Sequence, residues 1–237
     1  MNIEEILMRN RFRRCDFSRV RNTISLKKII EERNLHGKLG LIAEYKRRSP
    51  SGFNTDEDIH SYLSYVRSHR ISGLSILSEP LYFSGSFDDV ILAHRLNIPV
   101  LVKDFTPDED FVVQAYNAGG DAVLAILDFL DLSTVERIVK RALDLGMDVI
   151  EEYHRSDALK RFIPGENVIL GLNRRDLNSL DIEDISTRID YDVQILESGI
   201  NITNVARIPR TYNGYLIGTS ILRRDGTLEY LERNGLI

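Results

Sequence analysis

The chain has 237 residues and a mass of 27.2 kDa, with 43% hydrophobic and 28% charged residues, a composition that excludes a largely disordered or fibrous protein. Its net charge is -5, from 31 basic and 36 acidic residues, so we expect no general attraction to nucleic acid or to anionic membranes. Cys15 is the sole cysteine and excludes an intrachain disulfide.

The first 40 residues precede the first predicted strand. They begin with MNIEEILMRN, which carries acids where a secretory signal would be basic, and nowhere in the chain do about 18 apolar residues run together. We therefore expect a cytoplasmic protein. The stretches NIEEILM and SLKKIIEER have helical patterns, so residues 1–40 are predicted to form an N-terminal helical extension packed on a single domain at 41–237.

Eight short runs rich in β-branched and apolar residues follow. They are LIAEY (from 41), GLSIL (73), IPVLVK (98), DAVLAIL (121), MDVIEE (147), NVILGL (167), YDVQILES (191) and GYLIG (214). Helix-length segments lie between them, such as STVERIVKRALDLG (133–146), where Val135, Ile138, Val139, Ala142 and Leu143 share one face. Strands alternating with helices predict a parallel sheet, and eight units in this length predict an α/β fold, a closed (β/α)8 TIM barrel. A doubly wound open sheet is the alternative.

Several predicted strands begin with apolar residues and end in polar ones. Because strand side chains alternate, Glu44 and Lys46 share the face of Ile42, and the same pattern recurs in four further strands. The polar residues brought to one end of a barrel are Glu44, Lys46, Lys103, Glu152, Asn173 and Glu197. Any one of them alone fits a solvated strand end. Five strands with one pattern favour a site whose lysines and acids act as general acids and bases.

Two glycine-containing segments follow the last two strands, ESGI (197–200) and IGTSILRR (217–224). Glycines let the main chain approach an anion, and barrels often bind phosphate with the loops after strands seven and eight. Each segment alone is more typical of a turn, but the pair favours a phosphate site, and SPSG (49–52) could complete it.

These stretches resemble the indole-3-glycerol phosphate synthase family of tryptophan biosynthesis. The similar segments, in the order of the family, are IAEYKRRSPSG, SILSEPLYFSGSFDDV, PVLVKDF, AGGDAVLAIL, VIEEYH, LGLNRRDL, ESGI and YLIGTSILRR, which span about residues 41 to 224. The resemblance implies a carboxy-lyase that closes 1-(2-carboxyphenylamino)-1-deoxyribulose 5-phosphate to indole-3-glycerol phosphate, with loss of carbon dioxide and water. It implies no cofactor and no metal.

The resemblance also implies roles for the catalytic residues. Lys103 is the general acid that protonates the substrate ketone, and Lys46 pairs with the anthranilate carboxylate. Glu152 acts as base or acid in the dehydration, while Glu44 and Asn173 orient the reacting groups. Which of Lys103, Lys46 and Glu152 carries each proton transfer stays open.

Further family positions are implied to bind substrate. The apolar residues of the aromatic-ring pocket are Phe83, Phe105 and Leu124. The phosphate residues are Ser49, Gly199, Ile200 (through its backbone), Gly218 and Thr219. The residues near the ribulose hydroxyls are Glu197 and Ser198, and Arg175 is included as a charge that holds the loop after the sixth strand.

One departure from the family concerns Glu151-Glu152, where the family usually has an apolar residue before its glutamate. Alignment on the following histidine selects Glu152 and turns Glu151 outward, although a one-residue bulge would exchange them. His154 lies beyond the strand end and is interpreted as structural.

Three other functions share parts of this pattern. An orotidine 5'-phosphate decarboxylase has Lys/Asp clusters, but the acids in VKDFTPDED are wrongly spaced for it. A sugar isomerase would share the phosphate loops without needing the lysine and glutamate set, and a barrel without activity would bind ligand without turnover. We expect a phosphorylated small molecule as the substrate and a monomer, with a homo-oligomer as the alternative.

Overall fold

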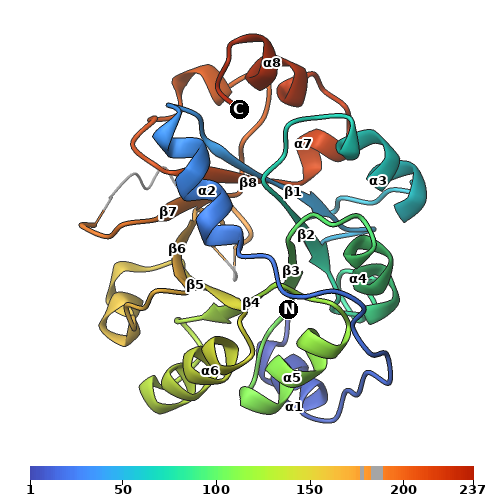
Figure 1. The fold of residues 1–237 in the computed structure, drawn as a ribbon, viewed down its shortest axis with the longest axis vertical. Helices are drawn as coiled ribbons and strands as arrows, with labels where there is room; N and C mark the ends of the chain where they lie inside the picture. Colours follow the sequence, from blue (N-terminus) through green and yellow to red (C-terminus); the bar gives the residue numbers. More distant parts are fainter. Residues whose placement is uncertain (177–178, 183–188) are drawn as a thin grey trace.

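Eight parallel strands close into a barrel in the order in which they occur along the chain (Figure 1). The computed structural model describes residues 1–176, 179–182 and 189–237, so Leu177, the last residue of LGLNRRDL, lies outside the described part. The strands are β1 (Gly40–Tyr45), β2 (Gly73–Leu77), β3 (Val100–Lys103), β4 (Ala122–Ile126), β5 (Asp148–Tyr153), β6 (Val168–Asn173), β7 (Gln194–Glu197) and β8 (Gly214–Ile217). All eight predicted strands are confirmed. Pairing of β1 with β8 excludes the open sheet.

Helices cover the outside of the first half of the barrel. They are α3 (Ile59–Arg67), α4 (Phe87–His94), α5 (Glu109–Asn117) and α6 (Leu132–Asp144). The predicted helix at 133–146 is α6, which begins at Leu132 because the Asp131 side chain caps it by accepting from Thr134 N. Its predicted inner face is buried except for Leu143, which is 44% exposed.

Two connections in the second half of the barrel contain a short 3-10 helix where a regular barrel has an α-helix. The connection after β5 contains the 3-10 helix η1 (Ser156–Arg161), and the connection after β7 contains η2 (Val205–Arg207). Pro164 and Pro209 follow these segments, and proline cannot continue a helix because it lacks an N–H group. The chain then closes with α7 (Thr219–Leu222) and α8 (Thr227–Arg233) after β8.

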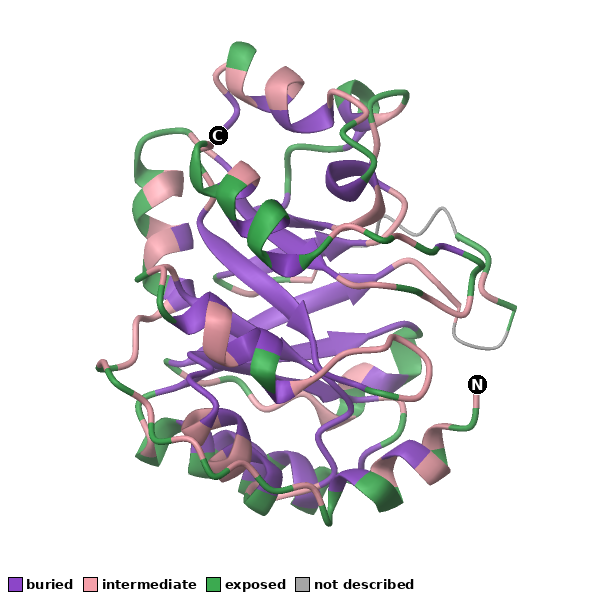
Figure 2. Ribbon diagram, turned by 90° about the vertical axis from the view of Figure 1, so that its right-hand side faces the viewer, coloured by how far each residue is buried: buried purple, intermediate pink, exposed green. Residues whose placement is uncertain are grey.

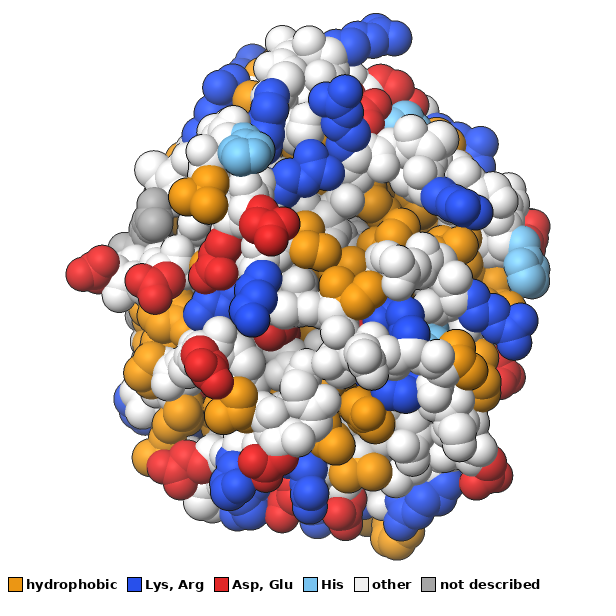
Figure 3. All heavy atoms as spheres, viewed as in Figure 1, with side chains coloured by type: hydrophobic (Ala, Val, Ile, Leu, Met, Phe, Trp, Pro, Cys, Tyr) orange, Lys and Arg blue, Asp and Glu red, His pale blue; other side chains and the backbone are white. Residues whose placement is uncertain are grey.

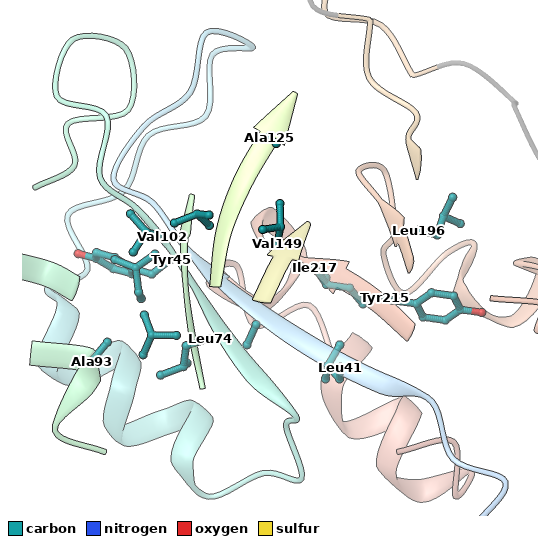
Figure 4. Packing of buried hydrophobic residues seen from close by; sticks show 14 of the residues in the cluster. Leu41, Tyr45, Leu74, Ala93, Val102, Ala125, Val149, Leu196, Tyr215 and Ile217 are labelled. Carbon is teal, nitrogen blue, oxygen red and sulfur yellow. The ribbon is translucent and has the colours of Figure 1, made fainter. Parts of the chain in front are cut away.

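The alternation of strand side chains divides the core into two layers. Outward residues such as Tyr45, Val102 and Val149 pack against the helices in one cluster, part of which Figure 4 shows. Inward residues fill the barrel in a second cluster, among them Ile42, Leu101, Ile150, Ile169 and Ile195. The strands are therefore buried on both faces (Figure 2).

The N-terminal segment reaches both ends of the barrel. Helix α2 (Leu26–Leu35) closes the end at which the strands begin, with Leu26 and Ile30 wholly buried against the barrel interior. The first residue of β1 is Gly40, where a Cβ atom would lie only 2.7 Å from Ile30 Cγ1, so the close approach of α2 requires glycine. Helix α1 (Ile3–Asn10) lies toward the other end, where Asn10 Nδ2 donates to Asp104 Oδ1 at 2.7 Å.

The surface mixes both signs of charge. Figure 3 shows acidic and basic side chains interspersed over one face. Within the described ranges, no helix is both long and apolar enough to cross a membrane.

Candidate active site

A cavity opens at the carboxyl ends of the strands and collects the polar strand ends. We call it the mouth cavity, and the predicted residues that line it are Glu44, Lys46, Ser49, Phe83, Lys103, Phe105, Leu124, Glu152, Asn173, Arg175, Glu197, Ser198 and Gly218. Barrel closure places them together because all the strands are parallel and end on the same side.

Lys103 contacts two carboxylates at the centre of the mouth cavity. Its Nζ atom lies 2.5 Å from Glu152 Oε2 and 2.5 Å from Glu197 Oε2, and all three side chains are at most 10% exposed. Lys103 ends β3, whereas Glu152 and Glu197 come from β5 and β7, so the contacts cross the barrel interior.

The charges of this triad perturb one another. Burial opposes the charge of Lys103, but the carboxylates of Glu152 and Glu197 outweigh it and raise the Lys103 pKa. Burial also opposes ionisation of Glu152, but the Lys103 charge lowers the Glu152 pKa to about 2. Burial raises the pKa of Glu197 to about 8, with Lys103 opposing the effect and Glu152 adding to it. The Lys103 charge thus favours ionisation of Glu152, while burial and the neighbouring Glu152 charge favour the neutral form of Glu197.

A second ion pair lies at the end of β1. Lys46 Nζ is 2.6 Å from Glu44 Oε1, and both side chains are largely buried. Gly218 makes room for the pair, because a Cβ atom at this position would lie 2.3 Å from Glu44 Oε1 and 3.1 Å from Lys46 Nζ. Next to the pair, the Arg47 guanidinium donates hydrogen bonds to both carboxylate oxygens of Asp89 in α4. This contact anchors the loop that carries Lys46.

Asn173 and its neighbours form a hydrogen-bonded rim. Asn173 Oδ1 accepts from Ser198 Oγ at 2.7 Å and from Arg175 N at 3.0 Å, so within the described residues its amide NH2 group can donate to a bound molecule. Arg175 Nη1 donates to the Leu180 carbonyl at 2.7 Å, as expected for a residue that holds the loop after β6. Burial lowers the pKa of its guanidinium, and the side chain also lines the cavity.

Part of the lining of the mouth cavity is apolar. Phe83, Phe105 and Leu124 lie there as predicted, and the sequence reasoning missed Leu77, Ile126, Leu216 and Met1. Phe83 is held by Glu79, whose carboxylate accepts from the backbone N–H groups of residues 81 to 83. No local pattern distinguishes the missed residues from ordinary core residues.

An adjoining pocket shares Ser51, Arg175, Leu216 and Gly218 with the mouth cavity. The predicted phosphate residues that line it are Gly199, Ile200, Gly218 and Thr219, whereas Ser49 lines the mouth cavity alone. Gly199 has a φ of 70°, a left-handed conformation that favours glycine. The sequence reasoning missed Ser51 and Arg223, although Ser51 stands in SPSG and Arg223 in IGTSILRR.

The two adjacent acids of β5 face opposite sides of the strand, without a bulge. Glu152 faces the mouth cavity, whereas Glu151 points outward, where its Oε2 atom accepts from Ile163 N at 2.9 Å. Glu151 is wholly buried, and its Oε1 atom has no hydrogen-bond partner in the described part of the chain. Burial raises its pKa to about 8.

No group of three His, Cys, Asp or Glu side chains is arranged to hold a metal ion among the residues that the structure describes. The arrangement instead offers general acids and bases beside apolar residues, with an adjoining pocket whose lining includes glycines, hydroxyl side chains, two arginines and Asp225.

Comparison with known proteins gives a consistent result. Residues 2–233 match the family model described as indole-3-glycerol phosphate synthase. The chain is 67% identical over its whole length to the indole-3-glycerol phosphate synthase of Thermoplasma acidophilum, and 58% identical to that of Thermoplasma volcanium, each also covered in full. The enzyme of the same name from Picrophilus torridus is 42% identical over 89% of this chain and 87% of its own.

A solved structure supports the fold alone. The 3-keto-L-gulonate-6-phosphate decarboxylase of Vibrio cholerae superposes with a TM-score of 0.60 at 13% identity, covering 83% of this chain and 96% of its own.

Proposed function

Because the chain belongs to the indole-3-glycerol phosphate synthase family, we propose that the mouth cavity and the adjoining pocket hold one molecule of its substrate. The enzyme closes 1-(2-carboxyphenylamino)-1-deoxyribulose 5-phosphate to indole-3-glycerol phosphate and releases carbon dioxide and water. In our proposal the anthranilate ring lies against Phe83, Phe105 and Leu124. The phosphate then lies in the adjoining pocket, which the shared lining supports.

Lys103 is the general acid of the ring closure in this proposal. The anilino ring carbon attacks the ketone, and negative charge develops on the ketone oxygen as the bond forms. An ammonium group held in a buried cavity supplies both a proton and a favourable field there. Its contacts with Glu152 and Glu197 hold it in the protonated form before the reaction.

Glu152 and Asn173 act after the ring has closed. Loss of the carboxylate restores the aromatic ring, and the remaining step removes a hydroxyl and a hydrogen from the new ring. Glu152 serves this dehydration as base or acid, since it lies in contact with Lys103. The NH2 group of Asn173 orients the hydroxyl that leaves.

Lys46 binds the substrate carboxylate before carbon dioxide leaves. It is paired with Glu44, which fixes its position, and an ammonium group can contact a second carboxylate. Glu197 and Ser198 lie on the rim near the ribulose hydroxyls, where the Glu197 carboxyl group and the Ser198 hydroxyl can hydrogen-bond to them.

The phosphate contacts main-chain N–H groups at Gly199, Ile200, Gly218 and Thr219, together with the Ser49 hydroxyl. To this predicted set we add Arg223, whose guanidinium lies 5.8 Å from the Phe53 ring centroid and lines the adjoining pocket. A guanidinium group suits a phosphate because its N–H groups match the spacing of the oxygens.

We also propose that residues 1–40 and 41–237 form a single domain. The protein works as a monomer in the cytoplasm. The extension contacts both ends of the barrel, which supports a single domain. The single cysteine suits a reducing compartment. Light scattering of the purified protein measures the oligomeric state, and a mass of twice 27.2 kDa would exclude the monomer.

The observation that carries the proposal is the contact of Lys103 with two buried carboxylates. We expect Lys103→Ala to bind substrate nearly as well as the parent protein and to lose ring closure by at least about 100-fold. The measurement is indole fluorescence after addition of the carboxyphenylamino-deoxyribulose phosphate, with binding followed separately. Lys140→Ala is the matched control, since that side chain is 75% exposed on α6. Near-normal turnover by Lys103→Ala would remove this residue from its role.

A further inference from the structure

The aromatic ring of Phe53 lies beside two cations of the substrate site. The Nζ atom of Lys46 lies over this ring at 5.9 Å from its centroid, and the guanidinium carbon of Arg223 lies over it at 5.8 Å. Lys46 lines the mouth cavity and Arg223 lines the adjoining pocket. Lys46 and Phe53 follow β1, whereas Arg223 follows α7, so one ring joins the two pockets and the two ends of the barrel sequence.

Packing fixes the position of the Phe53 ring. The residue is only 7% exposed and belongs to the outward cluster of the core. Its backbone carbonyl accepts from Ser49 N at 2.9 Å, and an antiparallel bridge between Arg48 and Asn54 flanks this turn. The loop that carries Lys46 and Ser49 therefore ends on a firmly held aromatic ring.

The two cations depend on the ring to different degrees. Lys46 is also paired with Glu44 at 2.6 Å, and its side chain is 14% exposed. Arg223 is exposed, and its guanidinium forms no ion pair with a carboxylate in the described part of the chain. Arginine loses much side-chain freedom when it binds a ligand, and a contact that already restrains the guanidinium reduces this loss.

An aromatic ring suits this position chemically. Its face carries partial negative charge and attracts a cation within about 6 Å of the centroid. The ring adds no net charge, and it leaves the N–H groups of the cations able to bind anions. A carboxylate in the same place would attract both cations, but it would repel the carboxylate and the phosphate of the substrate.

We propose that Phe53 is a positioning residue that holds Lys46 and Arg223 by cation–π attraction and so aligns the carboxylate site with the phosphate site. The inference rests on the proposed roles of Lys46 and Arg223. Because Phe53 acts through these two cations, its loss weakens substrate binding more than the chemical steps.

Fluorinated phenylalanines at position 53 test the proposal, because fluorine withdraws electrons from the ring face with little change in ring size. Replacing Phe53 by 4-fluoro-, 3,5-difluoro- and 3,4,5-trifluorophenylalanine should raise KM stepwise. We expect a rise of about three- to tenfold for three fluorines, while kcat stays within about twofold. The same replacements of Phe12 are the matched control, because this residue is 78% exposed and lies outside both pockets.

Arg223→Gln shows whether both cations take part. In this variant KM should still rise with fluorination of Phe53, but by a smaller factor, because only Lys46 remains over the ring. A rise that is unchanged by Arg223→Gln, or that disappears with it, would overturn the shared contact. So would a KM that does not depend on fluorination, or an equal rise in the Phe12 series.

Inorganic phosphate separates this proposal from the proposed function, because its binding requires no turnover. Titration calorimetry should show a stepwise loss of phosphate affinity in the Phe53 series. If Arg223→Gln weakens phosphate binding and the fluorinated rings do not, the phosphate site stands and the role of Phe53 is wrong. If phosphate affinity falls with fluorination but the parent protein forms no indole product, the role of Phe53 stands and the proposed reaction is wrong.

Discussion

At the scale of single residues, the triad depends on a neighbour that has no side chain. Gly171 of β6 is paired with Glu152 of β5, and a Cβ atom at Gly171 would lie 2.7 Å from Glu197 Oε1. A methyl group there would require the Glu197 carboxyl group, which contacts Lys103 through Oε2, to shift. The glycine therefore sets the space in which the two carboxylates share Lys103.

Gly171→Ala should accordingly displace the Glu197 carboxyl group. We expect kcat to fall by about 10- to 100-fold, because misplacement of catalytic groups by about 1 Å has effects of this size. Steady-state kinetics measure this, and Gly165→Ala controls for an added methyl group, since its nearest neighbour would lie at 3.1 Å. Unchanged kcat in Gly171→Ala would show that Glu197 has room to move.

Arg223 offers a prediction about substrate binding. If its guanidinium contacts the phosphate, Arg223→Gln should raise KM by about tenfold, since a hydrogen bond to a charged group contributes about 1.5–3 kcal/mol, while kcat changes little. Arg224→Gln is the matched control, because Arg224 pairs with Glu57 and lies outside the adjoining pocket. Equal KM values for the two variants would count against a phosphate contact of Arg223.

At the scale of elements, α2 closes the end of the barrel opposite the mouth cavity. Leu26 and Ile30 pack against the inward cluster, and Asp148 at the start of β5 accepts from Ser25 Oγ and Lys27 N. Helix α2 thus contributes to the core without contributing to the site, whereas α1 packs beside the mouth cavity through Asn10 and Asp104.

Ile30→Ala should lower the free energy of unfolding by about 2–5 kcal/mol, because it leaves a cavity in a tightly packed region. Turnover of the folded protein should change little, since the catalytic side chains lie at the other end of the strands. Urea denaturation measures the first effect and indole fluorescence the second. Leu35→Ala on the same helix is the control, because this position is 84% exposed. An equally small loss of unfolding free energy in both variants would mean that α2 does not close the core.

At the scale of the whole molecule, Glu151 links stability to pH. Its pKa is raised by burial from 4.5 to about 8. Between these pH values the folded protein keeps a proton that the unfolded chain releases, so the free energy of unfolding falls as pH rises through this window. The full contribution is present below about pH 4.5.

Glu151→Gln removes this dependence, because glutamine does not ionise. We expect the stability of the variant relative to the parent protein to increase from pH 5 to pH 8, as measured by urea denaturation at both values. A constant difference between the two proteins would mean that the carboxyl group titrates alike in the folded and unfolded states.

Much of the fold could be read along the chain. The period-two pattern of each strand is local, so it located all eight strands and predicted Glu152 inward and Glu151 outward. The alternating pattern led us to expect a helix after β5 and after β7 as well. These connections contain only short 3-10 helices, each followed by a proline. Met1 was missed because its place in the wall depends on how α1 packs at the mouth.

The sequence by itself determined the barrel, its family and the residues that gather at the mouth, since these follow from local patterns and from motifs in order. Only the tertiary structure decided how the charges pair. Lys103 could have faced Glu44, yet it contacts Glu152 and Glu197, and Glu152 in turn lies beside His154. These contacts join strands that are far apart in the chain, so the distances that set the proton positions exist only once the barrel has closed.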